Sequence, residues 1–123
     1  MVTNTISKEA EETLARLQVQ NEQLEALLIQ KQSLMAEKEE IEAALKELEK
    51  SESNEVFKIV GPILVRSTPS KVKKELEEEK EEIEVRLKTI ERNEAKLKES
   101  VEKAKNKLRE LLPALQSEAP SAA

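Results

Sequence analysis

The sequence predicts a mainly α-helical protein: a long antiparallel coiled-coil hairpin, with a β-hairpin at the connecting end. Of its 123 residues, 38% are charged and 1% are aromatic, which is typical of long exposed helices and not of a compact globule. Two stretches of helical periodicity, nearly equal in length, flank a short β-branched segment that contains the only glycine. These observations together indicate the fold class.

The first helix is expected over residues 7–50. Ser7 suits the N-cap, and Glu9 falls in the first turn, where a carboxylate complements the exposed amide dipoles. Residues 51–54 (SESN) are poor helix formers and end the helix. Its apolar residues recur mostly at steps of three and four, as in a coiled coil: Leu14, Leu17, Leu24, Leu27, Leu28, Leu34, Ile41, Leu45 and Leu48.

The heptad phase of this helix predicts one irregularity. The phase of Leu17 and Leu24 does not continue into that of Leu34, which indicates a three-residue slip near Leu27 and Leu28. Asn21 lies between Leu17 and Leu24. Either Asn21 lies in the helix interface, where it fixes the register or admits water, or the slip turns Asn21 toward solvent.

The second helix is expected over residues 69–112, after Thr68 as N-cap and with Pro69 at the first helical position. Its apolar positions are Val72, Leu76, Ile83, Leu87, Ile90, Leu97, Val101, Ala104, Leu108 and Leu111, and the step through Ile83 and Leu87 predicts a local break in phase. Pro113 stops it, and residues 113–123 are expected to be a disordered tail. Because the two helices are equal in length and joined by a short link, we expect them to pack antiparallel along their whole length, which places Glu9 opposite Leu111.

The segment between the helices predicts a β-hairpin over residues 55–67. Val56–Val60 and Ile63–Ser67 form two strands around Gly61-Pro62, although Gly-Pro is not a favoured two-residue turn and a wider loop stays open. Both faces of the hairpin are apolar. Phe57, Ile59 and Leu64 are expected on one face, and Val56, Val60, Ile63 and Val65 on the other.

A lone hairpin with two apolar faces is marginal in water and needs cover from other chains. Hairpins of several copies that close into an oligomeric β-barrel core would supply that cover and remove the strand edges. The predicted oligomerisation residues are Val56, Phe57, Ile59, Val60, Ile63, Leu64 and Val65. The alternative is that this apolar segment is simply an aggregation hazard. We interpret Glu55, Lys58, Arg66 and Pro62 as gatekeepers that restrict its pairing to sister subunits.

Composition weighs against several function classes. The chain has no Cys, His or Asp, so we expect no enzyme, no metal site and no cofactor, and we interpret the glutamate run at 77–84 as a solvated helix face. A net charge of −5 opposes binding to nucleic acid or to an anionic membrane. No apolar run approaches the roughly 20 residues of a membrane span, and no leader is evident, which favours a cytoplasmic protein.

The run VFKIVGPILVRSTPSKVKKELEEEKEEIEVRLKTIERNEAKLKE, residues 56–99, resembles the beta-type subunits of the prefoldin family. The resemblance implies that the whole chain is one subunit of a hexamer with an alpha-type partner and further beta-type copies. It also implies an ATP-independent chaperone that holds unfolded clients and passes them to a group II chaperonin. The high charge fits a heat-adapted archaeal member of the family.

The helix ends are the predicted client-binding region, because the end of the second helix carries more apolar surface than the first helix can cover. The residues are Ile6, Leu14, Leu108, Leu111, Leu112 and Leu115. The alternative is ordinary packing at a frayed coil end. A different function also stays open, namely a structural coiled-coil spacer or adaptor that uses the same hairpin.

Overall fold

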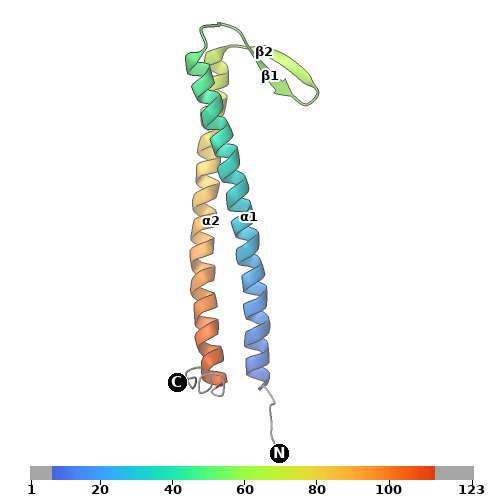
Figure 1. Cartoon of the computed structure of the whole chain (residues 1–123), viewed down its shortest axis with the longest axis vertical. Coiled ribbons are helices and arrows are strands. Elements are labelled where there is room, and N and C mark those ends of the chain that lie inside the picture. The colour runs from blue at the N-terminus through green and yellow to red at the C-terminus, as the bar shows by residue number, and fades with distance from the viewer. Residues whose placement is uncertain (1–6, 113–123) are drawn as a thin grey trace, which may run out of the picture. The chain divides into compact units, whose positions relative to one another are not determined.

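Two helices and one strand pair make up residues 7–112, the part of the chain that the computed structural model describes (Figure 1). Helix α1 spans Lys8–Lys50 and helix α2 spans Pro69–Leu111, with strands β1 (Val56–Val60) and β2 (Ile63–Ser67) between them. The predicted fold class is confirmed. Each helix has 43 residues, which corresponds to about 65 Å at about 1.5 Å per residue.

Side-chain caps fix where the helices begin. The backbone N–H of Ala10 donates to Oγ of Ser7 at 3.1 Å, ahead of α1. The backbone N–H of Lys71 donates to Oγ1 of Thr68 at 3.3 Å, and Pro69 follows as the first residue of α2. Each cap satisfies an amide that lacks an intrahelical acceptor. Thr68 alone therefore separates β2 from α2.

The chain divides into two compact units, and each holds part of both helices. The hairpin unit is residues 30–90, and the terminal unit comprises, among the described residues, 7–29 and 91–112. In the hairpin unit Nζ of Lys38 lies 3.2 Å from Oε2 of Glu84, and the ion pair of Lys80 with Glu42 measures 3.1 Å. Residue numbers therefore rise along one helix as they fall along the other, as an antiparallel pair requires.

The terminal unit has the same antiparallel arrangement. Nζ of Lys107 lies 3.0 Å from Oε1 of Glu9, and Nε2 of Gln20 donates to Oγ of Ser100 at 2.6 Å. Lys107 precedes Leu111 by about one helical turn, so the contact agrees with the expected pairing of Glu9 near Leu111.

The least exposed positions of α1 form a seam that alternates in steps of three and four without interruption. They are Ala10, Thr13, Leu17, Gln20, Leu24, Leu27, Lys31, Leu34, Lys38, Ile41, Leu45 and Leu48. The predicted slip near Leu27 and Leu28 is therefore wrong. The two leucine phases are the two alternating positions of one heptad, and polar residues such as Gln20 and Lys38 fill the places where the sequence pattern seemed to break.

The seam of α2 is equally regular from Lys80 to Leu111, through Ile83, Leu87, Ile90, Glu94, Leu97, Val101, Ala104 and Leu108. The predicted break at Ile83 and Leu87 is also wrong, because Lys80 and Glu94 occupy seam positions. Asn21 is exposed and Gln20 holds the seam position beside it. The outward alternative for Asn21 is the one observed, although no slip causes it.

The two units differ in what they bury. In the hairpin unit the buried apolar residues are Ile41, Ile83 and Ile90. In the terminal unit they are Ala10, Val101 and Ala104, together with Thr13, whose hydroxyl donates to the carbonyl of Glu9 at 2.8 Å. Larger buried side chains remove more apolar surface from water, so we expect the seam of the hairpin unit to contribute more to stability per residue.

Replacing Ile83 by Ala should lower the free energy of unfolding by about 2–5 kcal/mol, because Ile83 is buried between the helices. The measurement is chemical denaturation followed by circular dichroism at one fixed protein concentration. Val85→Ala, at a 63% exposed position two residues along the same helix, is the matched control and should change stability by about 0.5 kcal/mol or less. Equal losses in both variants would contradict the seam assignment.

Candidate functional site

The hairpin is a two-stranded antiparallel sheet whose register pairs Val60 with Ile63. Only Gly61 and Pro62 lie between these partners, so the open question of a wider loop is resolved in favour of a two-residue turn. Gly61 has a φ of 57°. A positive φ at the first central residue, followed by the fixed negative φ of proline, is the pattern of a type II′ turn, which suits the twist of a hairpin.

The register assigns the apolar side chains to two faces, because paired residues share a face and neighbours along a strand alternate. Ile59 pairs with Leu64, and Phe57 lies on the same face. The second face carries Val56, Val60, Ile63 and Val65. This distribution is the one expected from the sequence, with Lys58 added to the second face and Arg66 to the first.

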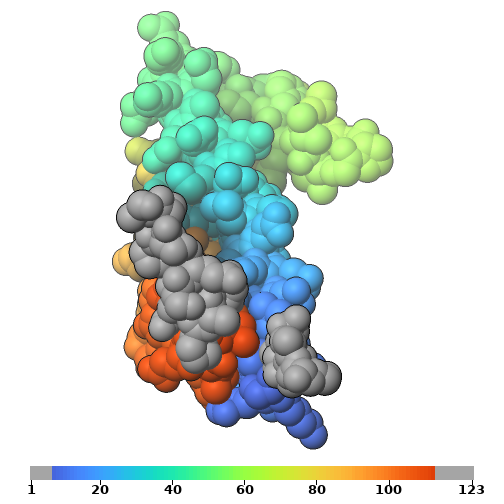
Figure 2. Space-filling view, turned by 60° about the horizontal axis from the view of Figure 1, so that its bottom comes forward, coloured from blue at the N-terminus to red at the C-terminus, as the bar shows by residue number. Residues whose placement is uncertain are grey.

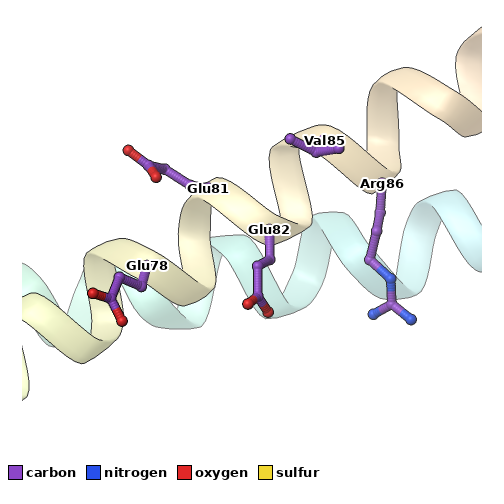
Figure 3. Close-up of a pocket in the computed structure, with 5 residues that line it drawn as sticks. All are labelled: Glu78, Glu81, Glu82, Val85 and Arg86. Carbon is purple, nitrogen blue, oxygen red and sulfur yellow. The ribbon is translucent and has the colours of Figure 1, made fainter.

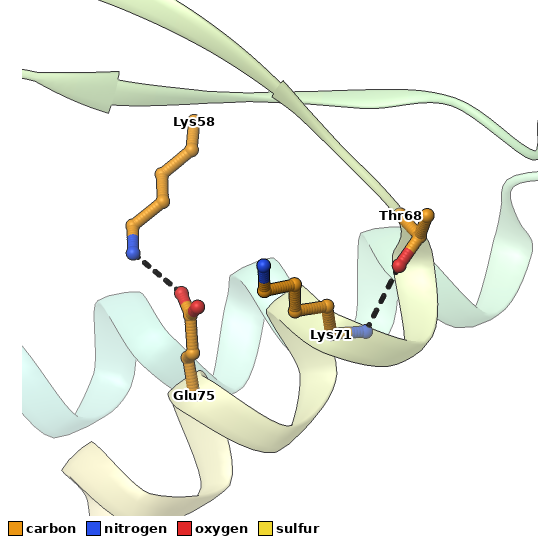
Figure 4. Close-up of polar contacts among 4 residues, drawn as sticks. All are labelled: Lys58, Thr68, Lys71 and Glu75. Atoms are coloured by element: carbon orange, nitrogen blue, oxygen red, sulfur yellow. Dashed lines mark hydrogen bonds and ion pairs between the residues drawn. The ribbon is translucent and has the colours of Figure 1, made fainter.

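The second face is turned toward α2. Lys58 extends from β1 to the carboxylate of Glu75 on α2 and pairs with it (Figure 4). The face with Phe57, Ile59 and Leu64 therefore points away from that helix. We call these three residues the outward face.

The outward face is left open to solvent. Phe57 is 57% exposed, Ile59 75% and Leu64 67%. Val60, Ile63 and Val65 on the second face are exposed as well, and only Val56 is half-buried. The strands project from the side of the helices (Figure 2). Apart from Val56, the predicted oligomerisation residues are left exposed by both helices, and this apolar exposure marks the hairpin as an interaction surface.

The charged residues that flank the apolar strands are paired within the chain. Nε of Arg66 lies 3.2 Å from Oε1 of Glu55 across the base of the hairpin, and Lys58 pairs with Glu75. The sequence pattern missed the partnership of Lys58 with Glu75, because nothing local links residues 17 positions apart.

The Lys58 ammonium changes the acidity of its partner. Its hydrogen bond and charge, with a further attraction from Lys71, hold the pKa of the Glu75 carboxyl below its ordinary value, against a smaller opposing effect of desolvation. Because the pKa is lowered in the folded state, the stabilisation from this pair is present above the ordinary pKa of glutamate. It is lost as the pH falls through the lowered value.

The predicted client-binding residues that the structure describes lie near the start of α1 and near the end of α2. Leu14 of α1 is 39% exposed, while Leu108, Leu111 and Leu112 are half-buried. Ile6 and Leu115 lie outside the described residues.

The glutamate run of α2 lies on its solvated side, as interpreted from the sequence. Glu78, Glu81 and Glu82 are exposed around Val85 and Arg86 (Figure 3). Within residues 7–112 no cluster of three or more acidic side chains is arranged to hold a metal ion. Neither described helix is long and apolar enough to cross a membrane.

A helical hairpin with an uncovered apolar strand pair at its connecting end is typical of a subunit of a larger assembly. The model of the family described as "Prefoldin subunit" matches residues 11–114 of the chain. The chain belongs to the prefoldin family, and it is a prefoldin-type chaperone subunit.

The relatives found are beta-type subunits. A prefoldin subunit beta of Saccharolobus islandicus is 35% identical over 105 residues, which is 85% of this chain and 83% of the relative. The prefoldin subunit beta of Sulfolobus acidocaldarius is 30% identical over 90% of both chains. The crystal structure of the prefoldin beta subunit from Thermococcus strain KS-1 matches with a TM-score of 0.81 at 32% identity, covering 89% of this chain and 97% of that one. The resemblance inferred from residues 56–99 is thereby confirmed.

Replacing Lys58 by Met should raise the pKa of Glu75, because both the hydrogen bond and the nearest charge are removed. The measurement is a carboxyl-carbon NMR titration of the folded protein. Lys71→Met is the control and should raise the same pKa by less, since Lys71 acts on Glu75 through its charge alone. An equal or larger rise in the Lys71 variant would show that Lys58 does not hold Glu75.

Proposed function

We propose that the chain is a subunit of an ATP-independent holdase whose oligomeric core is a β-barrel built from hairpins such as β1–β2. The observation that carries this proposal is the exposure of the outward face, since Ile59 is 75% exposed in a segment of high β-propensity. The two outer edges of the strand pair also need hydrogen-bond partners. Hairpins of an alpha-type subunit and of further beta-type copies supply both.

The proposed activity lies at the opposite ends of the helices. Leu14, Leu108, Leu111 and Leu112, with Ile6 and Leu115, bind apolar segments of unfolded proteins, and a group II chaperonin in the cytoplasm receives the client. The exposed position of Leu14 supports this site. Neither nucleic acid nor a membrane takes part, in keeping with the net charge of −5.

The first test concerns assembly. Replacing both Ile59 and Leu64 by Lys should place charges inside the barrel at a cost of several kcal/mol per buried ion, which is enough to dissociate the oligomer. Sedimentation velocity should fall to that of a monomer or dimer, while circular dichroism stays strongly helical. Val85→Lys, an added lysine on an exposed helix position, should leave sedimentation unchanged. An assembly that survives the double substitution would remove the barrel from the proposal.

The second test concerns the helix ends and separates a holdase from a spacer. Ending the chain after Lys107 removes Leu108, Leu111, Leu112 and Leu115 but keeps the hairpin and most of α2. Each leucine that becomes buried against a client contributes about 1.5–3 kcal/mol before ordering costs, and several subunits acting together multiply the effect. We expect the truncated assembly to lose its protection of a chemically unfolded protein against aggregation on dilution.

Two comparisons make this second test decisive. A chain that ends after Leu112 keeps three of the four leucines and should retain most of the protection. Salt should not restore protection to the shorter chain, since apolar contacts are not screened. Equal protection by all three proteins would favour the spacer.

A further inference from the structure

Arg66 lies at the base of the outward face and uses only part of its hydrogen-bonding capacity. Its side chain is 73% exposed, and Nε lies 3.2 Å from Oε1 of Glu55. Within residues 7–112, Glu55 is the one carboxylate that contacts Arg66. A guanidinium carries five N–H donors, and a single carboxylate takes two of them at most. The other N–H groups of Arg66 are therefore left for a second acceptor.

Glu55 has a matching spare capacity. Its side chain is 48% exposed, and its carboxylate oxygens can accept more hydrogen bonds than one arginine donates to them. Glu55 precedes β1 and Arg66 belongs to β2, so each lies beside one of the two open edges of the strand pair. The two edges therefore carry opposite charges at their bases, and the edge of one copy is complementary to the other edge of a second copy.

Charge also opposes the symmetric ways of joining two copies. Two β1 strands that run antiparallel and overlap fully place Lys58, the middle residue of Val56–Val60, directly opposite its own counterpart. Two β2 strands joined in the same way bring Arg66 diagonally beside a second Arg66, because Val65 is the middle residue. Like charges in cross-strand contact destabilise a sheet. Joining β2 of one copy to β1 of the next avoids both contacts.

Full antiparallel overlap of β2 with β1 of a second copy repeats the register that is found within the chain. Arg66 then pairs with Phe57 of the second copy, as it pairs with Phe57 of its own chain. Glu55 of the second copy comes two residues before that Phe57, at a diagonal distance that long side chains span. The contact within the chain shows that Arg66 and Glu55 can span such a diagonal. Arg66 would thus lie between two Glu55 carboxylates.

This contact is heterologous, because β2 of each copy meets β1 of the next. A repeated heterologous contact closes a ring when its rotation fits, and a closed ring leaves no strand edge free. Antiparallel overlap of β2 with β1 also brings the bases of neighbouring hairpins together. The helices of all copies then leave the ring on the same side, as the proposed β-barrel core with gathered helix ends requires.

We propose that Arg66 determines which partner joins the outer edge of β2, by binding Glu55 of a second copy of this chain in addition to its own Glu55. The inference rests on the proposed β-barrel core and names the partner at one of its edges. A hairpin that lacks a carboxylate at this place fits that edge less well.

The test measures the self-association of the full chain by sedimentation velocity over a range of concentrations. Arg66→Glu alone and Glu55→Arg alone should each weaken self-association about tenfold or more, because like charges then meet at every contact. An equimolar mixture of the two variants should associate as the wild type does, since each supplies the charge that the other lacks. Glu81→Arg, the same change of charge on the solvated side of α2, should leave self-association unchanged.

The mixture separates a contact between chains from a contact within one chain. A chain that carries both substitutions regains its internal ion pair and should also associate as the wild type does. Rescue by this double variant without rescue by the mixture would overturn the inference, because the pair would then act only within the chain. Unchanged self-association of the two single variants would overturn it as well.

Disulfide formation tests which strands meet. The chain has no cysteine, so chains with Lys58→Cys and chains with Val65→Cys can be joined only through the introduced thiols. Lys58 and Val65 pair directly within the hairpin, and they would pair again between β1 and β2 of neighbouring copies. Mild oxidation of a mixture should join one variant to the other. Disulfides formed only between identical variants would show that like strands meet and would overturn the inference.

Two further outcomes separate this inference from the proposed function. A wild-type chain that stays monomeric alone, but assembles and protects an unfolded protein once an alpha-type subunit is added, would refute the inference and leave the holdase function standing. If the chain associates through Arg66 as expected but its assembly protects no unfolded protein, the inference stands and the holdase function fails.

Discussion

The need to cover the strand pair governs the rest of the structure. A two-stranded sheet has two open edges, and here both faces carry apolar side chains that the chain's own helices leave exposed. The hairpin is also held to α2, through Thr68 at the end of β2 and through the ion pair of Lys58 with Glu75. The strand pair and the first turns of α2 are therefore fixed to each other, and the direction of α2 there follows from the orientation of the strand pair.

The helices can be long because their seam tolerates polar residues. Lys38 and Lys80 occupy seam positions, yet each ammonium reaches a carboxylate of the other helix at about the same distance, 3.2 Å and 3.1 Å. Exposed pairs of this kind contribute little to stability, so their value lies in disfavouring a shifted register, in which lysine would meet lysine. Ile41 and Ile83 lie within the same stretch and supply the apolar contact.

Local signals in the sequence were sufficient for the elements and insufficient for the contacts between them. Caps at Ser7 and Thr68 and the β-branched run around Gly61 predicted where helices and strands lie. The heptad phase was misread because only apolar residues were followed, and Gln20 and Lys38 are seam residues that a complete heptad count would have found. The partnership of Lys58 with Glu75 required the three-dimensional path of the hairpin.

The charges on the two helices bear on how a subunit with exposed apolar residues avoids non-specific association. The solvated side of α2 carries Glu81 and Glu82 one turn before Val85 and Arg86 beside it, so its exposed valine lies among charged side chains of both signs. The exposed Ile29 of α1 lies one turn from the carboxylate of Glu25 and from the uncharged Gln32 and Ser33. The net charge of −5 opposes non-specific association between chains, so exposed apolar residues among charged neighbours on the helices need not lead to aggregation.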